Sequence, residues 1–474
     1  MSRYTLLVKN TLLVFGGGVG AKLITLFMMP LYTRWLSVDG YGAVDLITIY
    51  VTLLVSVVSC GIPEALFVFP CGESKDKQKL YLSSGLAFNL ITVLAALVIF
   101  YLLSILSDIY HWNNSFTDNI WLIYIMLISN IFQHQVQQFS RSTNHMIVYS
   151  LTGLVYTISV VCLSFFLVKQ YGVCGYVICI TSANIISAFY CILFSKIYDY
   201  ISLSSIKILA IKEMLVYSIP LIPNSIMWWL VNALNRPVME GEIGMYDIGI
   251  YAVANRFPGI LSTLFTMFTA SWQISAIEEF KNKDYSIFYN RILKLVFNIL
   301  ICVLVGIVLL SKLLVKIFAN TDFYDAWRYI PILTFGTFIS CISAFVGVNF
   351  TASRKSKYFF YSSLFGAIAS ISLNFILIPV WGIWGACSSV VISFGIIAIS
   401  RILYSRRFVK ISDIPYYIIL LFVIMIIILL YTYNLQSLSY LVTLMIFFYI
   451  IRTNRKEFSI IKNKISSKIR NIKL

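Results

Sequence analysis

Apolar stretches long enough to cross a membrane follow one another along almost the whole sequence. A helix needs about 20 predominantly apolar residues to span a hydrocarbon core of about 30 Å. By this measure the 474-residue chain contains fourteen predicted spans, so both of its ends fall on one side of the membrane. The spans are predicted at 10–32, 43–70, 80–106, 120–140, 147–168, 174–195, 213–234, 248–275, 292–318, 329–351, 358–379, 382–403, 414–433 and 436–451.

The composition excludes water-soluble functions. Hydrophobic residues make up 60% of the chain and charged residues 12%, whereas a soluble domain carries about 25% charged and 45–50% apolar residues. A soluble enzyme, an extended nucleic-acid binder and a disordered scaffold are therefore ruled out. We predict an all-α polytopic membrane protein that needs no cofactor and has no nucleic-acid partner.

The basic residues predict the orientation. Of the 36 Lys and Arg residues, 28 fall on the side that holds both termini, Arg401 among them. Because basic residues concentrate in cytoplasmic loops, we expect both termini in the cytoplasm. Lys22 and Arg256 fall inside predicted spans. The opposite side carries six basic residues, which are Arg34, Lys169, Arg236, Lys312, Lys316 and Arg328.

Two pairs of matching motifs indicate an internal repeat. Arg34-x7-Gly42-x2-Asp45 recurs 202 residues later as Arg236-x7-Gly244-x2-Asp247, and Gly172-x2-Gly175 recurs 210 residues later as Gly382-x2-Gly385. Each half holds an even number of spans, so the copies enter from the same side. This predicts two six-helix bundles related by a pseudo-two-fold axis along the membrane normal. We expect lobes at 1–200 and 201–410, a helical hairpin at 411–451 and a basic cytoplasmic tail at 452–474.

Several motifs, in order, resemble a known family. They are Pro30-Leu31-Tyr32-Thr33-Arg34 with Tyr41-Gly42, then Ser218-Ile219-Pro220-Leu221-Ile222-Pro223-Asn224 ending at Asn235-Arg236, then Gly249-Ile250-Tyr251-Ala252-Val253-Ala254-Asn255-Arg256-Phe257. Over roughly residues 5–410 the chain resembles the Wzx-type polysaccharide flippases of the MOP exporter superfamily, which translocate O-antigen and capsule repeat units. The family often has Asp-Arg where this chain has Asn235-Arg236.

The resemblance implies a function and a location. The protein would be a transporter and not an enzyme, a V-shaped pair of bundles that alternates between inward- and outward-facing states. Its cargo would be an undecaprenyl-pyrophosphate-linked oligosaccharide, moved to the outer leaflet of the bacterial cytoplasmic (inner) membrane during polysaccharide or lipopolysaccharide synthesis. The bilayer, a polysaccharide polymerase and chain-length proteins would be its partners, and H+ or Na+ would be its coupling ion.

Cations inside spans are the strongest candidates for cargo binding. A charge at the centre of a membrane helix costs about 2.5–3.5 kcal/mol or more, so it needs a function or a partner. We expect Lys22 and Arg256 to face each other across a central cavity and bind the cargo phosphates. Arg34 and Arg236 are expected to clamp Asp45 or Asp247, with an outward-facing cargo contact as the second role.

Five further polar residues complete the predicted site. Glu64 and Asp45 are candidates for the coupling ion, Glu64 with helix capping as an equal alternative. His134 and Arg141 belong to a polar run that favours a wet cavity wall, or else a helix emerging into the cytoplasm. Asn224 is expected to line the binding region near Arg256.

Three alternatives stay open. A cation-coupled multidrug exporter of the same fold would place acidic residues deep in the cavity, where this chain has Lys22 and Arg256. A membrane-embedded polymerase or ligase would carry a large outer loop with catalytic Arg or His, and the longest outer loops here are about a dozen residues. A lipid II flippase would have more arginines in its first two spans.

Overall fold

The computed structural model describes residue 24, residues 26–112 and residues 114–453, and helices are the only regular elements in that part of the chain. Ten helical segments of this part are long and apolar enough to cross a membrane, with Ile208–Asn232 counted as one segment and Met146–Phe194 as another. The predicted all-α membrane architecture is confirmed at this level, while the count of fourteen spans stays a prediction. The first predicted span, 10–32, lies largely outside the described residues.

The helices follow the predicted spans closely along most of the chain. Residues 26–35 are helical, and short 3₁₀ turns η1 (Ile197–Tyr200), η2 (Leu203–Ser205), η3 (Ile219–Leu221) and η4 (Thr321–Arg328) join longer elements. The α-helices are α2 (Val38–Val58), α3 (Ile62–Val68), α4 (Lys75–Tyr110), α5 (Ser115–Asp118), α6 (Ile120–Ser142), α7 (Met146–Phe194), α8 (Ile208–Ser218), α9 (Ile222–Asn232), α10 (Asn235–Glu242), α11 (Met245–Ala254), α12 (Pro258–Glu279), α13 (Tyr285–Phe318), α14 (Ile330–Ala352), α15 (Lys357–Trp381), α16 (Ile383–Ser405), α17 (Ile414–Thr432) and α18 (Gln436–Thr453).

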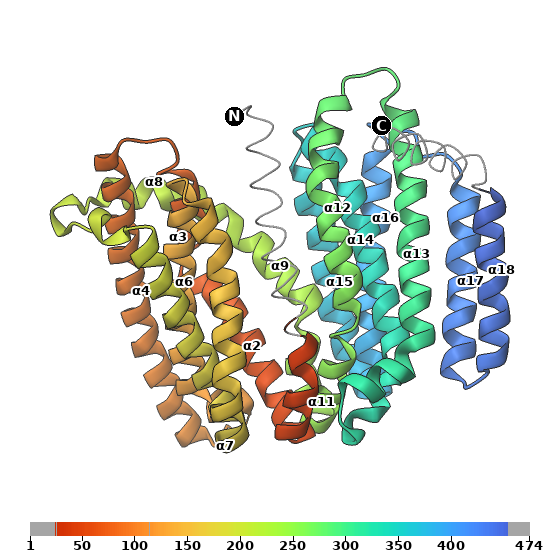
Figure 1. Ribbon diagram of the computed structural model, residues 1–474, viewed down its shortest axis with the longest axis horizontal. Helices are drawn as coiled ribbons and strands as arrows, with labels where there is room; N and C mark the ends of the chain where they lie inside the picture. Colours follow the sequence, from red (N-terminus) through yellow and green to blue (C-terminus); the bar gives the residue numbers. More distant parts are fainter. Residues whose placement is uncertain (1–23, 25, 113, 454–474) are drawn as a thin grey trace, which may run out of the picture.

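The helices gather on two sides of the molecule. Figure 1 shows α3, α4, α6, α7 and α8 on the left and α12 to α16 on the right, with α17 and α18 at the right edge. Near the bottom of the view, α2 of the left side packs against α11 of the right side, and α9 also contacts α2. The two sides are therefore joined at one end, through α2.

Three predicted spans are broken in the structure. Within 43–70 the chain leaves the helix at Ser59–Gly61, and Gly61 has the left-handed φ of +67° that ends α2 and starts α3. Within 213–234 the turn η3 separates α8 from α9 around Pro220 and Pro223. Within 248–275 Pro258 begins α12. Proline explains the last two breaks, because it lacks the N–H that an uninterrupted helix requires.

Two glycine turns have the same geometry at both places predicted by the second repeat motif. Gly172 has φ/ψ of 53°/−125° and Gly382 has 56°/−131°, a region that favours glycine. At Gly172 the chain reverses inside α7, since Cys179 Sγ contacts the Val160 carbonyl oxygen 19 residues earlier. Thus α7 is a hairpin of two helices, as the predicted spans 147–168 and 174–195 require.

Basic side chains collect at one end of the helices, which we call the basic face. This face is the upper one in Figure 1, where α3 connects to α4 and α12 connects to α13. The turn between α17 and α18 lies at the opposite face. Basic residues on connections and helix ends of the basic face are Lys75, Lys77, Lys79, Arg141, Lys196, Lys207, Lys281, Lys283, Arg354, Lys355, Lys357, Arg406, Arg407 and Lys410.

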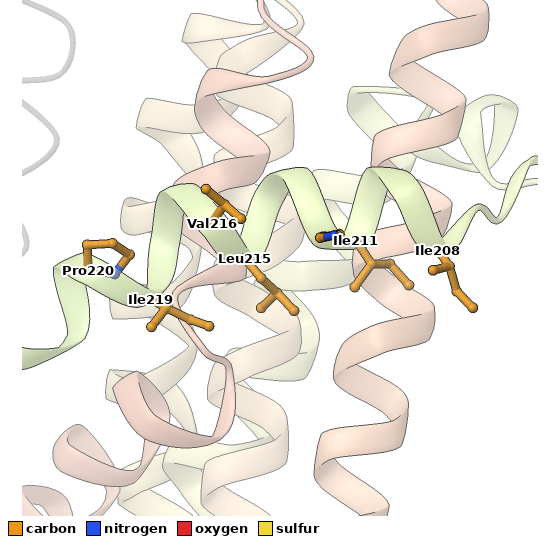
Figure 2. Close-up of a pocket in the computed structure, with 7 residues that line it drawn as sticks. Ile208, Ile211, Leu215, Val216, Ile219 and Pro220 are labelled. Atoms are coloured by element: carbon orange, nitrogen blue, oxygen red, sulfur yellow. The ribbon is translucent and has the colours of Figure 1, made fainter.

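Helix α8 exposes an apolar stripe close to the basic face. Figure 2 shows Ile211, Leu215 and Ile219 pointing to one side of α8, along a groove of about 530 Å³. The exposed Lys212 also lines this groove. Met214 and Ser218 are buried on another face of the helix, which packs on α3 and α4. Leu215 packs partly against the buried side chains of Ile62, Ala65 and Leu66 of α3, whereas Ile219 is exposed.

The second glycine of each turn motif makes the tightest contact in its hairpin. A Cβ atom on Gly385 would overlap the carbonyl oxygen of Leu377, and one on Gly175 would overlap that of Leu167. These contacting leucines are also 210 residues apart. Close approach of two backbones thus explains the spacing of both motifs.

Replacing Gly385 by Ala should open the α15–α16 hairpin, because backbone atoms have no rotamer through which to move aside. We expect a loss of about 1–3 kcal/mol, the usual cost of overpacking, measured as a lower thermal midpoint of the detergent-purified protein. Gly395→Ala is the matched control in α16, since its Cβ would meet nothing within 4 Å. Equal midpoints for the two variants would contradict this account.

Candidate functional site

Asp45 of α2 lies between two arginines that come from the later part of the chain. Its Oδ2 is 3.2 Å from Nε of Arg236 at the start of α10, and its Oδ1 is 3.6 Å from Nη2 of Arg256, which follows α11. We call these three residues the Asp45 cluster. One carboxylate facing two guanidinium groups leaves the cluster with a net positive charge.

Arg236 is the fixed member of the cluster. It is 5% exposed, and its Nη1 donates hydrogen bonds to the Asn232 carbonyl oxygen and to Asn235 Oδ1. Its guanidinium lies 4.9 Å from the centre of the Tyr251 ring, and Asn235 Nδ2 donates to Tyr251 Oη at 2.6 Å. Every side of this cation is therefore occupied by protein.

Arg256 is the available member of the cluster. Its side chain is 38% exposed, against 6% for Arg236, and its contact with Asp45 exceeds hydrogen-bond length. It sits in the short break between α11 and α12, where Pro258 begins the next helix. Its guanidinium also forms a side-chain hydrogen bond with Tyr41 of α2. An anion at Arg256 would therefore compete with one hydrogen bond to a tyrosine and one long contact with Asp45.

Close packing of α2 on α11 brings the cluster together. A Cβ atom on Gly42 would lie 2.6 Å from the carbonyl oxygen of Met245, and one on Gly249 would overlap the carbonyl oxygen of Val38. Glycine at both positions allows the two helices to touch along their backbones. Trp229 Nε1 of α9 adds a hydrogen bond of 3.0 Å to the Ile49 carbonyl oxygen of α2.

Of the two predicted arginine clamps, the structure contains the one made by Arg236. Arg236 pairs with Asp45, as one of the predicted options required. Arg34 is exposed, and it forms no ion pair within the described residues; the half-buried Asp247 has none there either. The difference follows from position, because Arg34 is exposed near the end of the helix formed by residues 26–35, whereas Arg236 is buried at the start of α10.

The polar residues predicted for the cavity wall lie apart from the Asp45 cluster. His134 of α6 is hydrogen-bonded to Gln138 at 3.1 Å and interacts electrostatically with the exposed Glu64 of α3. Arg141 stacks on Phe67 at 4.0 Å. No contact of these residues tests their predicted cargo or coupling roles, which stay predictions.

The structure does not test two other predicted site residues. Asn224 is exposed on α9, and among the described residues it forms no hydrogen bond to Arg256. Lys22 lies outside the described residues. Among residues 24, 26–112 and 114–453 no three His, Cys, Asp or Glu side chains come close enough to hold a metal ion.

Arg401 is a buried cation that the sequence reasoning missed, having counted it with the cytoplasmic loop charges. It is 1% exposed within α16, where Nε donates to Ser362 Oγ at 3.1 Å and Nη1 to the Ser343 carbonyl oxygen at 3.2 Å. Its guanidinium also lies 5.0 Å from the Phe359 ring centre. The available signal was its place inside the predicted span 382–403.

Comparison with known proteins identifies the fold. The chain is similar to a lipid II flippase, MurJ, in an inward closed conformation (TM-score 0.71, 15% identity, covering 94% of this chain and 100% of that one). It is also similar to an inward-facing multidrug resistance MATE family transporter of the MOP superfamily (TM-score 0.68, 14% identity, 82% and 94% covered). The chain is therefore an all-helical membrane protein with the fold of these transporters.

The sequence itself identifies the family. Residues 7–273, more than half of the chain, match the polysaccharide biosynthesis protein family, and the chain belongs to it. It is 24% identical over 233 residues to the capsular polysaccharide biosynthesis protein CapF of Staphylococcus aureus, a match that spans 48% of this chain and 58% of that relative. The resemblance predicted from the sequence motifs is confirmed.

Replacing Asp45 by Asn would leave the buried guanidinium of Arg236 without its counter-ion. Removing one partner of a buried ion pair costs about 3–5 kcal/mol, so we expect a marked fall in the thermal midpoint of the purified protein. The matched control is Asp39→Asn, an exposed carboxylate in the first turn of the same helix.

A double variant separates the ion pair from other effects of the Asp45 change. In Asp45→Asn/Arg236→Gln no lone charge remains buried, so part of the lost stability should return. If Asp45→Asn and Asp39→Asn unfold at the same temperature, the ion pair does not hold α2 in place.

Proposed function

We propose that this protein is a flippase that carries an undecaprenyl-pyrophosphate-linked oligosaccharide from the cytoplasmic to the outer leaflet by alternating access. The observation that carries the proposal is Arg256, a partly exposed cation held at 3.6 Å by a carboxylate that already has a second, buried partner. A pyrophosphate head cannot cross hydrocarbon alone and needs such a cation. Membership of a polysaccharide biosynthesis family supports the cargo class.

The pyrophosphate would replace Asp45 as the partner of Arg256. The exchange leaves no lone buried charge, because Asp45 keeps Arg236 and Arg256 gains the phosphate. A buried ion left without a partner would cost several kcal/mol, and the Asp45 cluster avoids this at every step. Losing one of its two cationic partners also weakens the hold of Asp45 on α11, so cargo arrival favours separation of α2 from α11.

The distribution of basic residues supports the direction of transport. The basic face would lie in the cytoplasm, with both termini, because cytoplasmic connections carry the excess of Lys and Arg. The joined end of the molecule, where α2 meets α11, would then close the outer side. The full architecture would comprise fourteen spans in two six-helix bundles and a C-terminal hairpin, in the bacterial cytoplasmic membrane.

The groove on α8 suits the lipid part of the cargo. Its apolar stripe (Ile211, Leu215, Ile219) would contact isoprenoid or acyl chains, and Lys212 would face their phosphate groups. Because α8 packs on α3 and α4 near the basic face, a lipid there would sit at the cytoplasmic leaflet. This is the side on which lipid-linked sugars are assembled.

The Asp45 cluster argues against export of organic cations. A cation exporter needs a carboxylate that can give up its protein partner for the drug. Asp45 faces two guanidinium groups, so a drug cation approaching it would meet a net positive charge. An anionic head group, in contrast, would be attracted by the net positive charge of the cluster.

The decisive variant is Arg256→Gln, tested in a strain that lacks the gene. A hydrogen bond to a charged group contributes about 1.5–3 kcal/mol, which corresponds to about 10–100-fold in binding. We therefore expect at least about ten-fold less surface polysaccharide at equal protein level. Arg256→Lys should retain more export, and Lys169→Gln, an exposed cation on α7, should export normally.

Three outcomes are informative. Full export by Arg256→Gln at normal protein level would refute phosphate binding by this residue. Arrest of growth with accumulated cell-wall precursor, in place of lost polysaccharide, would assign the cargo to lipid II. The same assay on Lys22→Gln tests the predicted second phosphate contact.

A further inference from the structure

A second polar contact ties the two sides of the molecule next to the Asp45 cluster. The carboxylate of Glu240 on α10 accepts a hydrogen bond from the backbone N–H of Ser115 and one of 3.3 Å from Tyr50 Oη on α2. Beside it lies a pocket of about 520 Å³. The pocket is lined by Tyr50, Leu103, Trp112, Asn114, Phe116, Thr117, Pro237, Glu240 and Gly241.

The pocket opens at the face opposite the basic face. Its wall comes from α2, α4, α5 and α10 and from the connection between α4 and α5. Trp112 is 46% exposed, and its ring stacks on Tyr110 at 6.0 Å, so the ring has one face open to a ligand. The volume lies within the usual range of about 300–1,000 Å³ for small-molecule sites.

The lining combines flat aromatic surface with hydrogen-bonding groups. Tyr50 and Phe116 pack edge to face at 5.3 Å, and Trp112 adds an indole at the rim. Glu240, Asn114 and Thr117 supply carboxylate, amide and hydroxyl groups, of which Asn114 and Thr117 also hydrogen-bond each other at the start of α5. A pyranose ring has matching features, since its C–H face packs on aromatic rings and its hydroxyl edge bonds to carboxylate and amide groups.

We propose that this pocket binds one sugar ring of an oligosaccharide on the exit side of the protein, an inference that rests on the proposed function. The ring would stack against Trp112 and donate a hydroxyl to Glu240. Because Glu240 belongs to α10 and Trp112 follows α4, the ring contacts both sides of the molecule. Its hydroxyls compete with Tyr50 and Ser115 for Glu240, so occupancy loosens this contact.

An organic cation is the other ligand that aromatic rings and a carboxylate can hold. Here the carboxylate already accepts an N–H and an O–H, and the remaining polar groups are an amide and a hydroxyl. The hydroxyl groups of a sugar could replace the N–H and O–H donors that now bind Glu240. The pocket chemistry therefore favours a neutral polyol over a cation.

The experiment reads the pocket directly through Trp112. The full-length protein, labelled with 5-fluorotryptophan and placed in phospholipid nanodiscs, gives a fluorine resonance for Trp112 that Trp112→Phe assigns. The probe is oligosaccharide released by mild acid from the surface polysaccharide of the host strain. Trp121, an exposed tryptophan on α6 outside the pocket, is the internal control.

We expect a saturable shift at Trp112 with none at Trp121, and at least about five-fold weaker binding in Glu240→Gln, since a hydrogen bond to a charged acceptor is lost. No shift at the solubility limit, equal shifts at both tryptophans, or unchanged affinity in Glu240→Gln would overturn the proposal. A shift produced by tetraethylammonium and not by the oligosaccharide would also overturn it and assign the pocket to cations.

The result is independent of the export assay. If Trp112 responds to sugar while Arg256→Gln exports normally, the phosphate exchange fails and the sugar pocket stands. If Arg256→Gln abolishes export and Trp112 is silent, the pocket proposal alone fails.

Discussion

The ion pair between Asp45 and Arg236 is the contact on which the arrangement of the two sides depends. It joins α2 to α10 at an N–O distance of 3.2 Å, with both side chains almost buried. Charges in such surroundings are stable only when they stay paired. The pair therefore holds the neighbouring contacts in register, including the glycine packing of α2 on α11 and the hydrogen bond from Tyr50 to Glu240.

The glycine repeat motif has the same backbone geometry in both copies, whereas the arginine repeat motif has different surroundings in its two copies. Gly172 and Gly382 have nearly equal backbone angles, because reversing a helix within one residue admits few solutions. Arg34 and Arg236 share a motif and have different surroundings, one exposed and one buried against Asp45. Backbone geometry is thus repeated in the two halves, while the charged contact is made once.

Long helices could be predicted from the sequence, because a segment of about twenty apolar residues satisfies its backbone hydrogen bonds in a membrane by forming an α-helix. The predicted span 120–140 differs from α6 by two residues. The apolar pattern alone runs unbroken through Gly61, and the signals for the break there are Gly61 itself and Pro63 at the start of α3. The partner of Arg256 could not be predicted from the sequence. Asp45 lies more than 200 residues away along the chain, and only the packing of α2 on α11 brings the two side chains together.

The Asp45 cluster places a cation where an anion can reach it without exposing a lone buried charge. A single Arg–Asp pair would have to separate before binding phosphate and would strand its carboxylate. With two arginines on one carboxylate, the tighter pair keeps Asp45 neutralised while the looser cation changes partner. In the proposed function, binding would act on the same contact that joins α2 to α11, and the free energy of phosphate binding would be available for opening that end. Coupling between cargo and conformation needs such a difference in contacts between states, and the proposed exchange of the partner of Arg256 would provide it.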